Sequence, residues 1–185
     1  MFRIMTSKNF IHEWASSLST LTTAIVPQQN DNLDIELNNI KGHHASLFCY
    51  LNGDKMRTLS GLMDEFASTL HFFEGFGKNW HALLDCLRDD LEYWKPFSSI
   101  IFAIKNAEYI LANDQEQLVW FFVTLEDVRQ HWSNNVDDIE GFGHVAIPFH
   151  VALLCSCDAY IDFNTRITRA LKLNEAYNIQ LQHLL

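Results

Sequence analysis

Three short apolar segments constrain most strongly what this chain of 185 residues folds into. They are Ser46–Leu51, Phe97–Ile104 and Ile147–Cys155, and each has the length and apolar content of a buried strand. The stretches between them are long enough to contain helices. Strands that are joined by helical crossovers pair in parallel. The sequence therefore predicts an α/β fold in which a three-stranded parallel sheet is packed with helices.

Helical periodicity appears in the stretches that connect these strands. Apolar residues recur every three or four positions in Thr58–Leu70, in Trp80–Trp94 and in Gln115–Trp132. A shorter helix is expected at Asn106–Asn113. The strand at Phe97–Ile104 is apolar on both faces, which is typical of a central parallel strand.

The pattern divides the chain into three parts. Residues 1–40 form an N-terminal extension, with a helix expected at Asn9–Ala24 and a polar linker at Val26–Asn39. Residues 41–157 form the main domain. Residues 158–185 form a C-terminal amphipathic helix or tail. The two extensions would enlarge an interface, mediate self-association or cap the edges of the sheet, and the sequence leaves these alternatives open.

The net charge of −10 is concentrated in two segments. Residues 74–94 hold five acids and two bases, a net charge of −3, and residues 113–140 hold seven acids and one base, a net charge of −6. Nucleic acid needs Lys and Arg to neutralise its phosphates, so this distribution argues against direct binding of nucleic acid. It suits a basic protein partner. The alternative is that the charge serves only solubility.

Targeting signals and disulfide patterns are not evident. No apolar run reaches the roughly 18 residues that a membrane span requires, and the N-terminus lacks the apolar segment of a signal peptide. The four cysteines (Cys49, Cys86, Cys155 and Cys157) form no CxxC pair, and three of them lie in apolar runs. We therefore expect free thiols in a cytoplasmic protein with no membrane contact.

Catalytic and metal-binding motifs are weak. His81 and Asp85 stand one helical turn apart, but two ligands without a clear third do not predict a metal site. The full GxGxxG is absent around Gly75 and Gly77, and no GxSxG motif occurs. We expect these glycines to supply positive φ and a close approach to a partner. No metal, no cofactor and no enzymatic activity is expected, and a metal- or His/Asp-dependent hydrolase is the remote alternative.

The polar face of the expected Trp80–Trp94 helix has an unusual charge pattern. His81, Asp85, Arg88 and Asp89 lie opposite the apolar stripe, and Asp85 and Asp89 place like charges one turn apart. Such a pair costs a few tenths of a kcal/mol, roughly, in an isolated helix. A solvated helix face and a partner-binding face both explain the pattern.

The sequence of Phe72–Leu87, FFEGFGKNWHALLDCL, favours the partner-binding interpretation. Seven of its residues resemble the recognition loop and helix of the barstar family, intracellular inhibitors of the ribonuclease barnase: Gly77, Asn79, Ala82, Leu83, Asp85, Cys86 and Leu87. A looser resemblance extends over Ala45–Cys155. It implies the same three-stranded parallel sheet that the periodicity predicts.

The resemblance also implies a function: inhibition of a basic ribonuclease by a loop and helix laid across its active site, with carboxylates in place of RNA phosphates. Asp85 matches the principal phosphate-mimicking position, and Asp127 or its neighbour Glu126 matches a second acidic contact. The remaining implied contacts are Gly75, Phe76, Gly77, Asn79, His81 and Asp89. The family has another aspartate where this chain has His81, and tyrosines where it has Gly75 and Phe76. A divergent toxin nuclease, with this chain as its immunity protein or antitoxin, fits these departures. A barstar-like module with a non-nuclease partner is the alternative.

Overall fold

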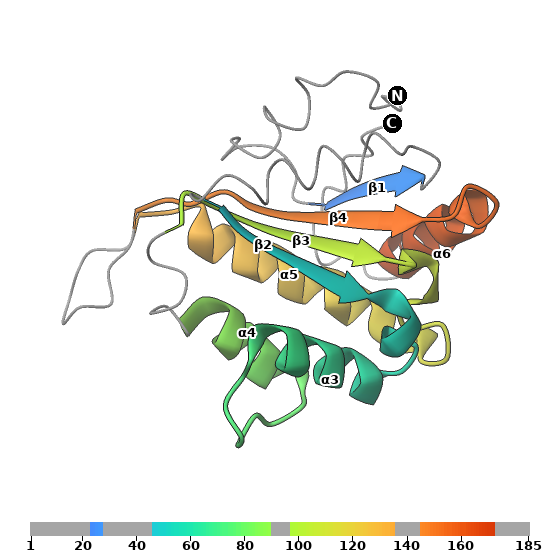
Figure 1. The fold of residues 1–185 in the computed structure, drawn as a ribbon. Helices are drawn as coiled ribbons and strands as arrows, with labels where there is room; N and C mark the ends of the chain where they lie inside the picture. Colours follow the sequence, from blue (N-terminus) through green and yellow to red (C-terminus); the bar gives the residue numbers. More distant parts are fainter. Residues whose placement is uncertain (1–22, 28–45, 90–96, 136–144, 173–185) are drawn as a thin grey trace.

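The computed structural model describes residues 23–27, 46–89, 97–135 and 145–172, with the backbone alone for 23–27. Its centre is a parallel sheet with the strand order β1-β4-β3-β2 (Figure 1). The strands are β1 (Thr23–Pro27), β2 (Ser46–Asn52), β3 (Ser99–Lys105) and β4 (Phe149–Cys155).

The predicted α/β fold is confirmed. β2, β3 and β4 coincide with the three predicted strands apart from one or two residues at their ends, and all their pairings are parallel. β3 lies between β4 and β2, and every residue from Ser99 to Ile104 is buried. Its central position explains why this segment is apolar on both faces.

The sheet contains one strand more than the three that were predicted. β1 pairs with the outer edge of β4, from Thr23 opposite Val151 to Pro27 opposite Cys155. The expectation of a helix to residue 24 and a linker from residue 26 is therefore wrong for residues 23–27, and the rest of those two segments lies outside the described residues. A strand of five residues carries little periodic signal, and what stabilises it is the open hydrogen-bonding edge of a distant strand.

Helices cover one side of the sheet, where Figure 1 shows α3, α4 and α5, and α6 lies beyond the carboxyl ends of the strands. The elements are η1 (Gly53–Met56), α3 (Leu59–Leu70), α4 (Trp80–Asp89), η2 (Ala107–Tyr109), η3 (Gln115–Gln117), α5 (Leu118–Trp132) and α6 (Tyr160–Lys172). The helices predicted at Thr58–Leu70, Trp80–Trp94 and Gln115–Trp132 are confirmed in position over the described residues, whereas the helix expected at Asn106–Asn113 is only the short 3-10 helix Ala107–Tyr109. The predicted continuation of α4 to residue 94 and the part of the C-terminal helix or tail at 173–185 lie outside the described residues.

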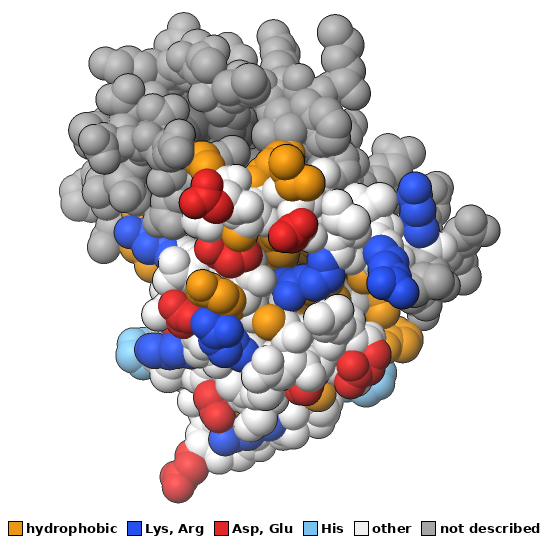
Figure 2. Space-filling view, turned by 90° about the vertical axis from the view of Figure 1, so that its right-hand side faces the viewer, with side chains coloured by type: hydrophobic (Ala, Val, Ile, Leu, Met, Phe, Trp, Pro, Cys, Tyr) orange, Lys and Arg blue, Asp and Glu red, His pale blue; other side chains and the backbone are white. Residues whose placement is uncertain are grey.

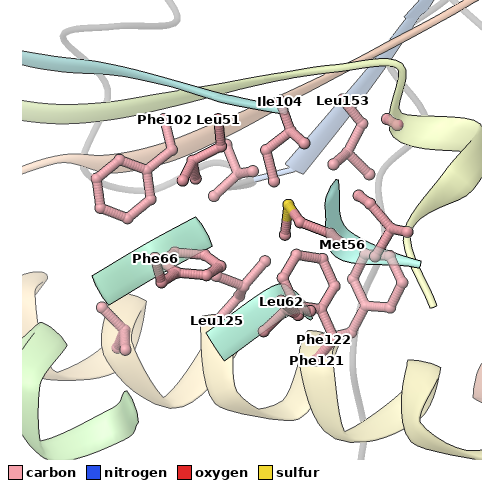
Figure 3. Packing of buried hydrophobic residues seen from close by; sticks show 14 of the residues in the cluster. Leu51, Met56, Leu62, Phe66, Phe102, Ile104, Phe121, Phe122, Leu125 and Leu153 are labelled. Atoms are coloured by element: carbon pink, nitrogen blue, oxygen red, sulfur yellow. The ribbon is translucent and has the colours of Figure 1, made fainter. Parts of the chain in front are cut away.

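The core lies between the sheet and the helices (Figure 3). Strand residues such as Leu51, Ile104 and Leu153 face Phe66 of α3 and Leu125 of α5, and each is at most 2% exposed. Burial of large apolar side chains is the main source of stability in such an arrangement. It fixes α3 and α5 to the sheet, and α4 then packs on α5.

The carboxyl ends of the strands are held together by polar contacts. Glu65 of α3, only 5% exposed, accepts a hydrogen bond from the Asn52 backbone N–H (2.9 Å) and pairs with Lys55 (3.0 Å). Asp114 accepts from the backbone N–H of Leu59 at the start of α3 (2.7 Å). Figure 2 shows this end of the molecule, where acidic and basic side chains are interspersed. Within the part of the chain that the structure describes, no helix is long and apolar enough to cross a membrane.

Candidate functional site

The segment 71–79 that connects α3 to α4 is held to the body of the protein. His71, in the left-handed conformation (φ 55°), ends α3. The rings of Phe72 and Phe76 pack together with centroids 5.0 Å apart, against the core. Lys78 forms an ion pair with Asp64 of α3 (2.6 Å). The loop is therefore built in place before any partner binds.

The two glycines of this loop do not adopt the positive φ that the sequence suggested. The left-handed residue is Lys78 (φ 46°), whereas neither Gly75 nor Gly77 lies in that region. The space around them is tight. A Cβ on Gly77 would lie 3.0 Å from Asn79 Nδ2 and one on Gly75 3.1 Å from the Phe73 ring. A side chain at either position would have to displace a neighbouring side chain, and a close approach of these glycines to a partner stays a prediction.

Asn79 starts the helix. Its Oδ1 accepts a hydrogen bond from the Ala82 backbone N–H (3.0 Å), and its Nδ2 donates to the Gly77 carbonyl (3.0 Å). This is N-cap geometry, which satisfies a backbone donor that has no partner inside the helix. The amide of Asn79 thus sets where α4 begins, and its contact with a partner stays a prediction.

Three contacts place α4 alongside α5. The Trp80 indole N–H donates to Gln117 Oε1 (2.9 Å) just before α5 begins, and the buried Trp132 indole donates to the Leu87 carbonyl (2.9 Å). Arg88 Nη2 donates to the Asp127 carbonyl (3.2 Å). The start of α4 contacts the start of α5, and the end of α4 contacts the second half of α5. The two helices therefore run side by side in the same direction. Sequence reasoning placed Arg88 on the polar face of the helix and missed this contact with α5.

The outer face of α4 presents His81 and Asp85. Both are exposed, one turn apart, and neither forms a hydrogen bond or ion pair within the described residues. Their predicted place on the polar face is therefore confirmed. Asp89 is the last residue of α4, and its side chain lies outside the description.

The two alternatives for the second acidic contact have different surroundings. Glu126 is bound within its own helix, to Arg129 (2.6 and 2.9 Å) and Gln130 (3.0 Å). Burial raises the pKa of the Glu126 carboxyl, but the hydrogen bonds from Arg129 and Gln130 outweigh burial, so that this pKa lies below its ordinary value. The half-buried Asp127 makes no side-chain bond to any described residue. Asp127 is the carboxylate that remains available beside α4.

Unpaired carboxylates are common in this part of the molecule. Four acids of the loop, η3 and the two helices form no hydrogen bond or ion pair with a described residue: Glu74, Asp85, Glu116 and Asp127. Two neighbouring cations, Lys78 and Arg129, are already paired with other acids. This surface therefore presents negative charge that no described side chain neutralises at salt-bridge distance.

The cysteine thiols and the possible metal ligands bear on whether the described part of the chain could catalyse a reaction. Burial, with smaller effects of Glu108 and Cys157, raises the pKa of the Cys155 thiol to about 12, which disfavours the thiolate form that reacts. None of the four cysteines forms a disulfide, and Cys86 and Cys155 are buried. Among the described residues, no three His, Cys, Asp or Glu side chains converge closely enough to hold a metal ion.

The family described as Barstar (barnase inhibitor) matches residues 46–153, which is more than half of the chain. The chain belongs to the barstar family. The match begins at the first residue of β2 and contains the loop, α4 and α5. A family of barnase inhibitors acts by binding to a protein. β1, which pairs with β4, and α6, which contacts α5, lie outside the matched range.

Other comparisons concern the fold alone. No curated protein sequence matches the chain. Among solved structures it is similar to the ORC2 protein of Aeropyrum pernix in its ADP form, with a TM-score of 0.52, 11% identity and coverage of 96% of this chain and 45% of that one. The ADPNP–ADP complexes of the same protein give a TM-score of 0.47, 14% identity and coverage of 89% and 42%. The barstar-family chain spans less than half of these proteins.

Proposed function

We propose that this barstar-family chain is an intracellular inhibitor of a basic ribonuclease, acting as an immunity protein or antitoxin without catalysing a reaction itself. The loop 71–79 and α4 cover the active site of the nuclease. The observation that carries the proposal is the side chain of Asp85, which lies in the helix that resembles the family's recognition helix, is exposed, and has no partner among the described residues.

Charge complementarity directs the binding and sets its specificity. A ribonuclease active site collects Arg, Lys and His around the RNA phosphates, and a carboxylate meets such cations through short, charge-assisted hydrogen bonds. Asp85 is the principal phosphate mimic, and Asp127 adds a second carboxylate from the neighbouring helix. Because the packed rings of Phe72 and Phe76 anchor the loop to the core, less conformational freedom is lost on binding than for an unanchored loop.

Residues of this chain that differ from the family's pattern indicate which kind of nuclease is bound. His81 replaces an aspartate on the exposed face of α4, so the surface carries one negative charge less beside Asp85. We therefore propose an enzyme that differs from barnase in the cation that faces this position. The presence of His81 in place of an aspartate also fits the alternative, a protein-binding module whose partner is not a nuclease.

Inhibition assays test the proposal. The chain is added to barnase and to a panel of basic ribonuclease toxins, and cleavage of a fluorogenic RNA is followed. We expect inhibition of at least one enzyme, weakened by roughly 30-fold or more in Asp85→Ala, the size of effect of an interface hot spot. Asp162→Ala is the matched control, because Asp162 is an exposed acid of α6 that is likewise unpaired among the described residues.

The possible results separate the alternatives. Inhibition that Asp85→Ala leaves unchanged would place the interface elsewhere on the molecule. If no ribonuclease is inhibited, the non-nuclease alternative replaces the proposal. For an inhibited enzyme, the association rate should fall as salt rises, because ions screen exposed charges beyond about 10 Å at 0.1 M.

A further inference from the structure

Phe73 leaves an aromatic side chain in solvent, within a loop whose other phenylalanines are anchored to the core. Its exposed fraction is 62%, whereas Phe72 and Phe76 are half-buried and pack together against the core. Figure 1 shows the loop 71–79 projecting away from the sheet, beyond α3 and α4. Phe73 is thus a large apolar side chain outside the core, and aromatic side chains of this kind are enriched at protein interfaces.

The position of the Phe73 ring is defined by its own loop. The Phe73 carbonyl accepts a hydrogen bond from the Phe76 backbone N–H (3.0 Å), which closes a turn. Gly75 lies against the ring, since a Cβ on Gly75 would be 3.1 Å from Phe73 Cε2 and 3.3 Å from its Cδ2. The absence of a side chain at Gly75 therefore makes room for the ring. One edge of the ring rests on the loop, and most of its surface stays open to a partner.

Unpaired carboxylates accompany the ring in the chain. Glu74, the next residue, is exposed and forms no hydrogen bond or ion pair with a described residue. Asp85 is six residues after the N-cap Asn79, which places it about 9 Å along the helix that follows the loop. The loop and α4 thus present one uncharged aromatic ring together with carboxylates. A partner that fits this pattern combines a flat apolar surface with cations.

A ribonuclease that binds single-stranded RNA has this combination. It neutralises the phosphates with cations, and it stacks unpaired bases on aromatic or other planar side chains. A phenyl ring has the flat shape of a pyrimidine ring but no hydrogen-bonding groups, so it suits a stacking surface better than a polar pocket that reads base edges. Cations of the partner are attracted more strongly by Glu74 and Asp85, which offer them charge-assisted hydrogen bonds.

We propose that Phe73 occupies the surface of the ribonuclease on which a nucleobase of the RNA stacks. The loop then imitates a base, while Asp85 imitates a phosphate. Phe73 has this role only if the partner is a ribonuclease, so the inference rests on the proposed function. It adds an uncharged, specificity-determining contact to the acidic ones. Because the turn and Gly75 already position the ring, little of its freedom is lost on binding.

Variants of Phe73 test the inference on a ribonuclease that the wild type inhibits. Phe73→Ala should weaken binding roughly 10-fold or more, as expected for an aromatic anchor, and Phe73→Tyr, which keeps the ring, should stay within about 3-fold of the wild type. Phe73→Leu keeps apolar area without a flat ring and should recover only part of the loss. Ile161→Ala is the matched control, since Ile161 is 72% exposed on α6, and it should bind as the wild type does. Urea unfolding checks that each variant is folded.

Competition by parts of a nucleotide separates base mimicry from a general apolar contact. Binding of the full chain to the immobilised enzyme is measured with inorganic phosphate, or with whichever of the four ribonucleosides binds that enzyme most tightly. At about twice its own Kd, the nucleoside should raise the apparent Kd of the wild type roughly 3-fold by competition. It should leave Phe73→Ala unchanged, because this variant does not use the stacking surface. Phosphate should weaken both proteins, since both retain Asp85.

Two results would overturn the inference alone. One is binding that Phe73→Ala leaves unchanged, and the other is a nucleoside that competes equally with the wild type and with Phe73→Ala. In both cases the inhibition by the wild type would stand. A wild type that inhibits no ribonuclease would instead overturn the proposed function, and the base mimicry with it, so the two failures are distinguishable.

Discussion

Acidic side chains at the carboxyl end of the sheet and on the α4–α5 side of the molecule have opposite surroundings. At the sheet, Glu65 and Asp114 each accept a hydrogen bond from a backbone N–H of another element. On α4 and α5, Asp85 and Asp127 accept none from any described residue. The same residue type thus holds the fold together in one region and is left available to a partner in the other.

Burial and the position of backbone donors cause the difference. Glu65 is buried at the end of β2, where the N–H of Asn52 and the Lys55 ammonium compensate its charge. Asp85 projects from the outer face of a helix, where every backbone donor nearby is used by the helix itself. The comparison teaches that the contacts of an acid, and not the local density of acids, separate a structural from a partner-binding role.

Removing Glu65 should have the largest effect on folding. Glu65→Ala leaves the Asn52 N–H without its acceptor, and we expect the free energy of unfolding to fall by about 2–3 kcal/mol. Urea unfolding measures it. Glu65→Gln keeps an acceptor and loses only the pair with the exposed Lys55, so a loss within about 1 kcal/mol is expected. Equal losses in both variants would contradict this account.

Asp114 should have a smaller effect of the same kind. Asp114→Ala removes the acceptor for the first N–H of α3, which is worth about 1–2 kcal/mol of unfolding free energy. Asp114→Asn, which retains an amide oxygen, should recover part of that loss. Thermal unfolding of both variants measures the effect. An unchanged stability of Asp114→Ala would show that Asp114 does not stabilise the fold.

Glu126 provides an intermediate case that depends on pH. Its folded-state pKa lies below the ordinary value of 4.5 because Arg129 and Gln130 outweigh the effect of burial. Its contribution to stability is therefore present above pH 4.5 and lost as the pH falls through the lower, folded-state pKa. A pair of this kind is worth about 0.2–0.5 kcal/mol. Urea unfolding at pH 7 and pH 3.5 should show a smaller acid-induced loss in Glu126→Gln than in the wild type.

Asp85 and Asp127 should contribute least to folding. We expect Asp85→Ala and Asp127→Ala to change the free energy of unfolding by no more than about 0.5 kcal/mol, since neither carboxylate has a partner among the described residues. Urea unfolding of these variants beside Glu65→Ala gives the sharpest form of the comparison. A decrease of more than about 1 kcal/mol in the free energy of unfolding of Asp85→Ala would show that Asp85 stabilises the fold.

Local periodicity was enough to predict much of the fold and part of the site. The short apolar segments located β2, β3 and β4, and the 3.6-residue repeats located the helices and placed His81 and Asp85 together on the exposed face of α4. They did not reveal β1, because a five-residue strand depends on the free edge of β4, more than a hundred residues away. Nor did they reveal that Arg88 is bound to a carbonyl of α5.

The sequence by itself determined the α/β class, the apolar faces and the exposed pair of His81 and Asp85, because those properties depend on the order of neighbouring residues. Only the tertiary structure decided that Asp127 lies beside α4 and that Arg88 is bound to α5. Both depend on how α4 and α5 pack, through the Trp80–Gln117 and Arg88–Asp127 contacts. Side-chain contacts between distant segments have no periodic trace in the chain, so they become visible only once the helices are in place.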